Sequence, residues 1–220
     1  MIAPEPFEAF KSFKPLFEGQ PGTTPRYLTL LNAVREDAAF AIAEIRAARQ
    51  RSGDNLEAEL RAMLLYDNWR PQIVGAVALL LGATPSQTRL LWEAIEKPSW
   101  ISPQLAATAY QVDPNFCAEA LLRIERRARL NIDEASTMDW LQRHSALGPR
   151  SFDAHSAKLL AALVALVKRG DQGSDLLSAI DIQEIIASDT DGGGDIAVGW
   201  LEDIRLMLEH PIAKNFKPDA

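Results

Sequence analysis

The 220-residue sequence has a single cysteine, Cys117. One cysteine excludes any disulfide within the chain, so packing alone must hold the fold. This cysteine usage favours a reducing cytosol, although a periplasmic protein can also do without disulfides. The first residues, Met1 to Pro6, show no basic leader followed by an apolar run, so we expect no secretory signal. The sequence therefore predicts a cytoplasmic protein.

Long apolar runs are also missing. The longest, Ile73 to Ala83 and Leu159 to Val167, fall well short of the ~20 residues that cross a bilayer. We therefore expect no membrane contact. Since neither run carries a charge on any side, each is predicted to be a helix that neighbouring elements cover all round.

The common motifs of catalysis and metal binding are absent. There is no HExxH, CxxC or HxH spacing, no glycine-rich phosphate loop after a strand, and no Gly-x-Ser-x-Gly elbow. The three histidines, His144, His155 and His210, are scattered along the chain. We therefore expect no zinc site, no cofactor and no enzymatic activity.

Basic residues are fewer than acidic ones, with 23 Lys and Arg against 30 Asp and Glu. The formal net charge is −7. This balance argues against a protein that holds nucleic acid through its overall charge. Between Asp171 and His210 the acids accumulate and Arg205 is the single base. The segment is either a solvated face or a docking surface for a basic protein partner. The residues assigned to that surface are Asp175, Glu184, Glu202 and Asp203.

What the sequence does contain is a series of capped amphipathic segments. Thr84 and Asp113 are predicted N-caps, each followed by a proline at the first helical position. Asp54 and Glu57 are predicted to form a further capping box. No stretch alternates with period two between turn signals, so no sheet is expected. The prediction is an all-α protein of about nine to ten helices in a compact, curved array.

The domain prediction is an N-terminal arm over residues 1–26, rich in phenylalanine and proline, followed by one helical domain over residues 27–220. Pro15 is expected to kink or end any helix in the arm. The arm either packs onto the first long helix or is a detachable segment that docks on a groove or a second subunit.

An internal repeat organises the middle of the chain. The stretch Trp69 to Ala78 is echoed by Trp100 to Ala109, at a period of roughly thirty residues, which is the length of a helix-turn-helix repeat. Trp69 and Trp100 occupy equivalent positions and are predicted to pack between repeat units. The other three tryptophans are predicted to be core residues; they are Trp92, Trp140 and Trp200.

This repeat, with its Thr-Pro or Asp-Pro start to each second helix, resembles the HEAT and armadillo class of α-helical repeats. The resemblance implies a concave surface that binds macromolecules. Small acidic helical proteins similar to this one also occur as bacterial immunity proteins against secreted toxins. We therefore predict a protein-interaction module, with an immunity protein as its most concrete version. The alternative is a helical-repeat enzyme that binds nucleic acid or processes bases, for which the stretch Asp67 to Arg70 is the local candidate.

The loop from Asp189 to Asp195 is the most suggestive polar stretch. It places the carboxylates of Asp189, Asp191 and Asp195 around three glycines, as a calcium loop would. Trp200 stands at position twelve, where a calcium loop has a bidentate glutamate. The alternative is an ordinary loop between helices in which Asp195 caps the last helix.

Overall fold

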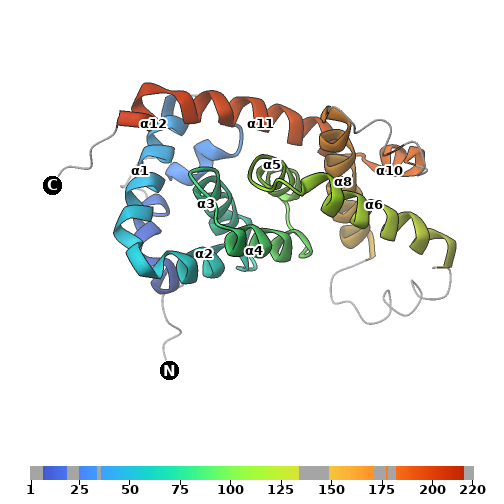
Figure 1. Ribbon diagram of the computed structural model, residues 1–220, viewed down its shortest axis with the longest axis horizontal. Helices are drawn as coiled ribbons and strands as arrows, with labels where there is room; N and C mark the ends of the chain where they lie inside the picture. Colours follow the sequence, from blue (N-terminus) through green and yellow to red (C-terminus); the bar gives the residue numbers. More distant parts are fainter. Residues whose placement is uncertain are drawn as a thin grey trace. The chain divides into compact units, whose positions relative to one another are not determined.

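The computed structural model describes residues 7–18, 25–33, 36–133, 149–170, 177 and 182–215. Two compact units divide the chain: unit 1 comprises Met1–Glu96 and Trp200–Ala220, and unit 2 comprises Lys97–Gly199. Every element in the described ranges is helical and none is a strand, which confirms the predicted all-α fold (Figure 1). The predicted arm boundary at residue 26 falls inside unit 1. A single domain over residues 27–220 stays a prediction.

Unit 1 contains three short 3-10 helices and the first four α-helices, together with the end of α11 and α12. Their bounds are η1 Glu8–Leu16, η2 Arg26–Leu30, α1 Glu36–Ser52, η3 Gly53–Asn55, α2 Leu56–Leu64, α3 Trp69–Leu80, α4 Pro85–Ile95, α11 Gly193–Glu209 and α12 Pro211–Asn215.

Unit 2 contains the remaining described helices and the beginning of α11. Their bounds are α5 Ser102–Val112, α6 Phe116–Asp133, α8 Pro149–Arg169 and α10 Gln183–Ser188. The first half of the sequence repeat thus forms the helix pair α3 and α4 in unit 1, and the second half forms α5 and α6 in unit 2. A HEAT-like stacking of these pairs stays a prediction. None of the described helices combines the length and the apolar character that a membrane crossing requires.

One of the three predicted helix starts is confirmed. Thr84 caps α4 in a full capping box with Gln87, and Pro85 is the first helical residue. The Asp113 carboxylate accepts a hydrogen bond from the Asn115 backbone N–H at 2.8 Å, but α6 begins at Phe116, so Pro114 is not its first residue as predicted. The predicted capping box of Asp54 is wrong. The 3-10 turn η3 occupies that position, and α2 begins after Asn55 without a side-chain cap.

Two sequence features that commonly end a helix, a basic run and a proline, do not end one here. Helix α6 continues to Asp133, past the basic run from Glu125 to Arg129. Pro211 is the first residue of α12.

Helix α3 is the centre of unit 1, as its charge-free sequence predicts. All residues from Pro71 to Leu79 are buried. A Cβ added at Gly75 would lie 3.1 Å from the side chain of Leu64, so the glycine allows α2 to approach α3 closely. Gln72, also buried, donates its side-chain N–H to the carbonyl oxygen of Tyr66 at 2.9 Å. The buried amide is therefore hydrogen-bonded, as a polar group in a core must be.

The N-terminal arm belongs to the core of unit 1. Phe10 and Phe13 are fully buried and Leu16 is 1% exposed. The arm helix η1 packs against α1 and α2, so the described residues 7–18 match the first of the two alternatives for the arm. The non-helical residue within η1 is Phe10, with φ −143° and ψ 51°, and not Pro15. The turn that buries the Phe10 ring therefore sets the kink.

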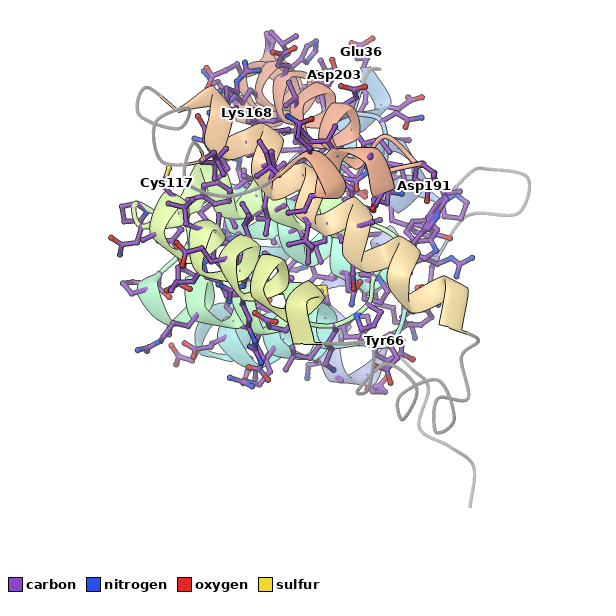
Figure 2. All side chains as sticks on the ribbon, turned by 90° about the vertical axis from the view of Figure 1, so that its right-hand side faces the viewer. Glu36, Tyr66, Cys117, Lys168, Asp191 and Asp203 are labelled. Atoms are coloured by element: carbon purple, nitrogen blue, oxygen red, sulfur yellow. The ribbon has the colours of Figure 1, made fainter. Side chains whose placement is uncertain are left out.

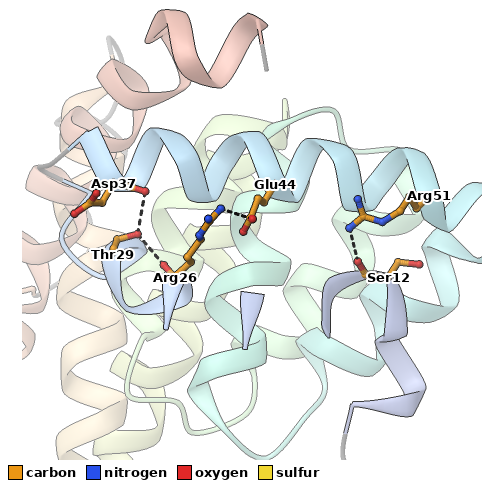
Figure 3. A network of polar contacts seen from close by, with 6 residues as sticks. All are labelled: Ser12, Arg26, Thr29, Asp37, Glu44 and Arg51. Atoms are coloured by element: carbon orange, nitrogen blue, oxygen red, sulfur yellow. Dashed lines mark hydrogen bonds and ion pairs between the residues drawn. The ribbon is translucent and has the colours of Figure 1, made fainter. Parts of the chain in front are cut away.

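Polar contacts tie both N-terminal 3-10 helices to α1 (Figure 3). Arg26 forms an ion pair with Glu44, and the Thr29 hydroxyl donates to the Asp37 carbonyl oxygen of α1 at 3.5 Å. Arg51, at the other end of α1, donates to the Ser12 carbonyl oxygen at 2.9 Å. These contacts fix the arm along the length of α1.

Two arginines of α1 bind carbonyl oxygens of distant helices. Arg46 donates to the carbonyl oxygen of Ala213 in α12 at 3.1 Å. Arg49 donates to Ala78 and, at 2.7 Å, to Gly82 at the end of α3. Burial, and then the like charge of Arg46, lowers the pKa of Arg49 from its usual range. Carbonyls at a helix end have no partner within the helix, so Arg49 supplies one.

In unit 2 the main packing is between α5 and α8. Residues 102–109 of α5 are buried, as are Leu160 to Val164 and Leu166 to Val167 of α8. The two predicted apolar runs are therefore largely core, one in each unit. Trp100 is not a core residue. It is 56% exposed, so the prediction that it packs between repeat units is wrong. Its ring instead lies over the ammonium of Lys158, 5.7 Å from the ring centroid.

Candidate functional site

The second half of α11 has two contrasting faces. Trp200, Leu201 and Ile204 are buried in unit 1. Leu206 is 65% exposed, and it lies four residues after Glu202 and three before Glu209, both also exposed. Residues at these spacings share one side of a helix. We call Glu202, Asp203, Leu206 and Glu209 the α11 docking face.

A hydrogen bond holds the second half of α11 to unit 1. The indole N–H of Trp200, on the opposite side of the helix, donates to the carbonyl oxygen of Leu30 at 2.8 Å. The two residues are 170 positions apart in the sequence, so this contact fixes α11 against the N-terminal part of unit 1. Glu209 forms an ion pair with Lys214 in α12, and both side chains are well exposed. An exposed pair of this kind contributes little and can be exchanged for a partner's charge.

Further acids lie near the second half of α11 on unit 1. Glu36 and Asp37 form the first turn of α1, and both are exposed. The Thr29 hydroxyl next to Leu30 is 3.5 Å from the Asp37 carbonyl oxygen, so α1 begins beside the segment that Trp200 contacts. The side chains of Glu36 and Asp203 point outward along the same edge of unit 1 (Figure 2). Phe40, one turn further along α1, is 39% exposed. This edge therefore combines negative charge with exposed apolar side chains.

Only part of the predicted partner surface can be located. Glu202 is exposed and Asp203 is half-buried on α11 in unit 1. Glu184 belongs to α10 in unit 2, and its side chain lies outside the described residues, as does all of Asp175. The sequence-based prediction of this surface named acids alone and did not include Leu206. Leu206 could have been found as an apolar residue that lies off the helical stripe of Ile196, Trp200, Ile204 and Met207.

The loop from Asp189 to Asp195 has a capping arrangement. One carboxylate oxygen of Asp189 accepts the backbone N–H of Gly193 at 2.9 Å, and the other accepts that of Gly194 at 3.3 Å. These N–H groups belong to the first turn of α11 and have no partner within the helix. Asp195 was predicted to be the cap, but it lies inside that first turn and is exposed. The described residues contain no group of three or more acidic, histidine or cysteine side chains placed to hold a metal ion.

Replacing Asp189 by alanine is therefore expected to destabilise the protein by about 0.5–2 kcal/mol, the usual effect of losing a helix cap. Asp191→Ala is the matched control, because Asp191 is exposed and its substitution should stay within about 0.5 kcal/mol. Urea unfolding followed by circular dichroism measures both. Equal effects of the two substitutions would contradict the capping role.

The stretch Asp67 to Arg70, the candidate for a base-processing site, forms a packed cluster at the start of α3. Asn68 caps the helix by accepting the Arg70 backbone N–H at 3.0 Å. The Arg70 guanidinium lies 5.0 Å from the centroid of the Trp69 ring and donates to the Tyr27 hydroxyl at 3.0 Å. The Tyr27 ring meets Trp69 edge to face at 5.8 Å. These contacts give Trp69 a packing role, and the nucleic-acid alternative stays a prediction.

The remaining tryptophans follow the prediction where they are described. Trp92 is 6% exposed and Trp200 is 3% exposed, so both are core residues. Trp140 and His144 lie outside the described residues. Cys117 is half-buried in α6 and carries a free thiol.

Comparisons with protein-family models, with curated proteins and with solved structures found no match for this chain.

Proposed function

We propose that the protein is a non-enzymatic interaction module that binds a basic protein partner through the α11 docking face. The observation that carries this proposal is the exposed Leu206 with an exposed glutamate on each side along the helix. A leucine that is 65% exposed gains nothing for the fold. It can contribute to binding, because burying a leucine side chain stabilises a complex by about 1.5–3 kcal/mol.

The flanking acids should raise the association rate of a basic partner and the selectivity for it. Complementary charge steers a basic partner toward the face and disfavours acidic proteins. Exposed charges farther apart than ~8 Å are screened at physiological ionic strength, so this contribution should fall as salt rises. The apolar contact of Leu206 should persist, because salt does not screen it. The contribution of the acids to binding should therefore fall as salt rises, and the contribution of Leu206 should not.

The most concrete version of this function is a bacterial immunity protein, whose partner is a secreted toxin with a basic surface. Its support is the small size, the net charge of −7 and the acidic edge of unit 1. In the source genome this version predicts a secreted-toxin gene beside the gene for this chain. Co-expression of the two should protect cells that the toxin alone kills.

Reversing two exposed acids of the face tests the proposal. Glu202→Lys with Glu209→Lys should lower the association rate of the partner about tenfold, within the range that electrostatic steering supplies. Leu206→Ser should raise the dissociation rate instead, because it removes apolar contact area. The matched control is Glu8→Lys with Asp54→Lys, the same charge change on exposed acids elsewhere in unit 1.

The partner would first be captured from lysate at low salt with the full chain as bait, identified, and then purified for kinetics on a biosensor. The proposal requires that the docking-face variants alone lose binding and that the wild-type association rate falls with salt. If the association rate falls as much in the control variant as in the docking-face variant, the effect depends on net charge alone. The docking face then has no special role.

A further inference from the structure

Helix α11 is anchored on both sides of Gly199. Before this residue, the first turn of α11 lies against α8, where a Cβ added at Gly193 would come within 2.2 Å of the Lys158 carbonyl oxygen. After it, Trp200 donates to the carbonyl oxygen of Leu30, and Leu201 is fully buried. The first anchor belongs to unit 2 and the second to unit 1.

Gly199 itself has no packing reason to be a glycine. A Cβ added there would meet no atom within 4 Å, whereas at Gly194 it would lie 3.2 Å from the Cβ of Ala165. Glycine in a helix interior favours the open backbone about fivefold more than alanine does, the equivalent of about 1 kcal/mol. The helix is therefore locally weakened at a position where alanine would fit.

Gly199 lies at the boundary between the two units. Unit 2 ends at Gly199 and unit 1 resumes at Trp200. The other crossing, between Glu96 and Lys97, lies in the turn between α4 and α5. Among the described helices, α11 is the one that runs from one unit into the other.

We propose that α11 opens at Gly199 and acts as a hinge between its two halves, each of which stays with its own unit. Opening breaks the hydrogen bonds that span Gly199, which are those of the backbone N–H groups of residues 200–203 to carbonyl oxygens four residues earlier. Hinges of this kind are a few residues that take up a large backbone change between rigid segments. The proposal stands without the proposed function.

Hydrogen–deuterium exchange on the full chain tests the hinge. In the wild type, the amides of residues 200–203 should exchange faster than those of residues 204–209 in the same helix. Gly199→Ala should slow exchange at 200–203 about fivefold and leave the rest of α11 unchanged. Equal protection along α11 in the wild type would overturn the proposal, whatever the substitution does.

Gly194→Ala is the matched control, because it makes the same chemical change on the same helix at a position with a close neighbour. It should speed exchange in the first turn of α11 and leave residues 200–203 as they are. If Gly194→Ala and Gly199→Ala both slow exchange at 200–203, the effect is general helix propensity and the hinge is rejected.

Spin labels give a second measurement, which does not depend on the local stability of the helix. One label on the native Cys117 in unit 2 and one on Asp54→Cys in unit 1 report the spread of distances between the units. The distribution should narrow in Gly199→Ala. An unchanged width would mean that the units do not move about this residue.

Discussion

Replacing Trp200 by alanine is expected to lower the free energy of unfolding by about 3–5 kcal/mol, the usual cost of truncating a buried tryptophan. The side chain is 3% exposed, so its removal leaves a cavity in unit 1. It also leaves the carbonyl oxygen of Leu30 without the indole N–H that now binds it at 2.8 Å. Urea unfolding followed by far-ultraviolet circular dichroism measures the change.

Trp100→Ala is the matched control, and its expected effect is much smaller. From the sequence repeat, Trp100 was predicted to pack between repeat units. At 56% exposure the side chain loses less contact when it is truncated, and its cation–π contact with Lys158 contributes about 0.5–1 kcal/mol, so the expected cost is about 1 kcal/mol. A cost for Trp100→Ala equal to that of Trp200→Ala would contradict the packing described for both residues.

Gly193→Ala is expected to destabilise the protein by about 1–3 kcal/mol, as overpacking of a close contact does. A Cβ at this position would come within 2.2 Å of the Lys158 carbonyl oxygen and 2.9 Å of its carbonyl carbon. These are backbone atoms of α8, which cannot swing aside as the end of a long side chain can. The start of α11 must therefore move away from α8, and the Asp189 cap is strained with it.

Thermal unfolding of Gly193→Ala beside Gly199→Ala measures this difference, since the two substitutions are chemically identical. The first should lower the melting temperature and the second should raise it or leave it unchanged. If calcium restored the melting temperature of Gly193→Ala, the loop would be a metal site after all. If Gly193→Ala proved neutral, the close approach of α11 to α8 would be wrong.

The candidate site was predictable only in its charge. The run of acids from Asp171 to Glu209 is visible in the sequence, and Glu202 is exposed as expected. Which acids share a surface depends on where the chain folds back, and Glu184 and Glu202 fall in different units. Leu206 joins the face because Trp200, Leu201 and Ile204 take up the buried side of the helix. That choice depends on partners that are distant in sequence.

The sequence by itself determined the features that depend on a few neighbouring residues. The all-α class, the start of α4 at Thr84 and the burial of α3 follow from capping chemistry and from runs without charge, which act within one or two helical turns. The exposure of Trp100 could not follow from its place in the repeat, because equivalent positions in a sequence need not meet equivalent neighbours.

Only the tertiary structure decided which segments meet. The arm residues Phe10 and Phe13 became core because α1 and α2 close over them, and Asp189 became a cap because the loop returns its carboxylate to Gly193. Trp200 became a core residue by reaching Leu30, 170 positions earlier. Such contacts depend on how distant segments pack together, and that packing is a property of the whole chain that no local pattern contains.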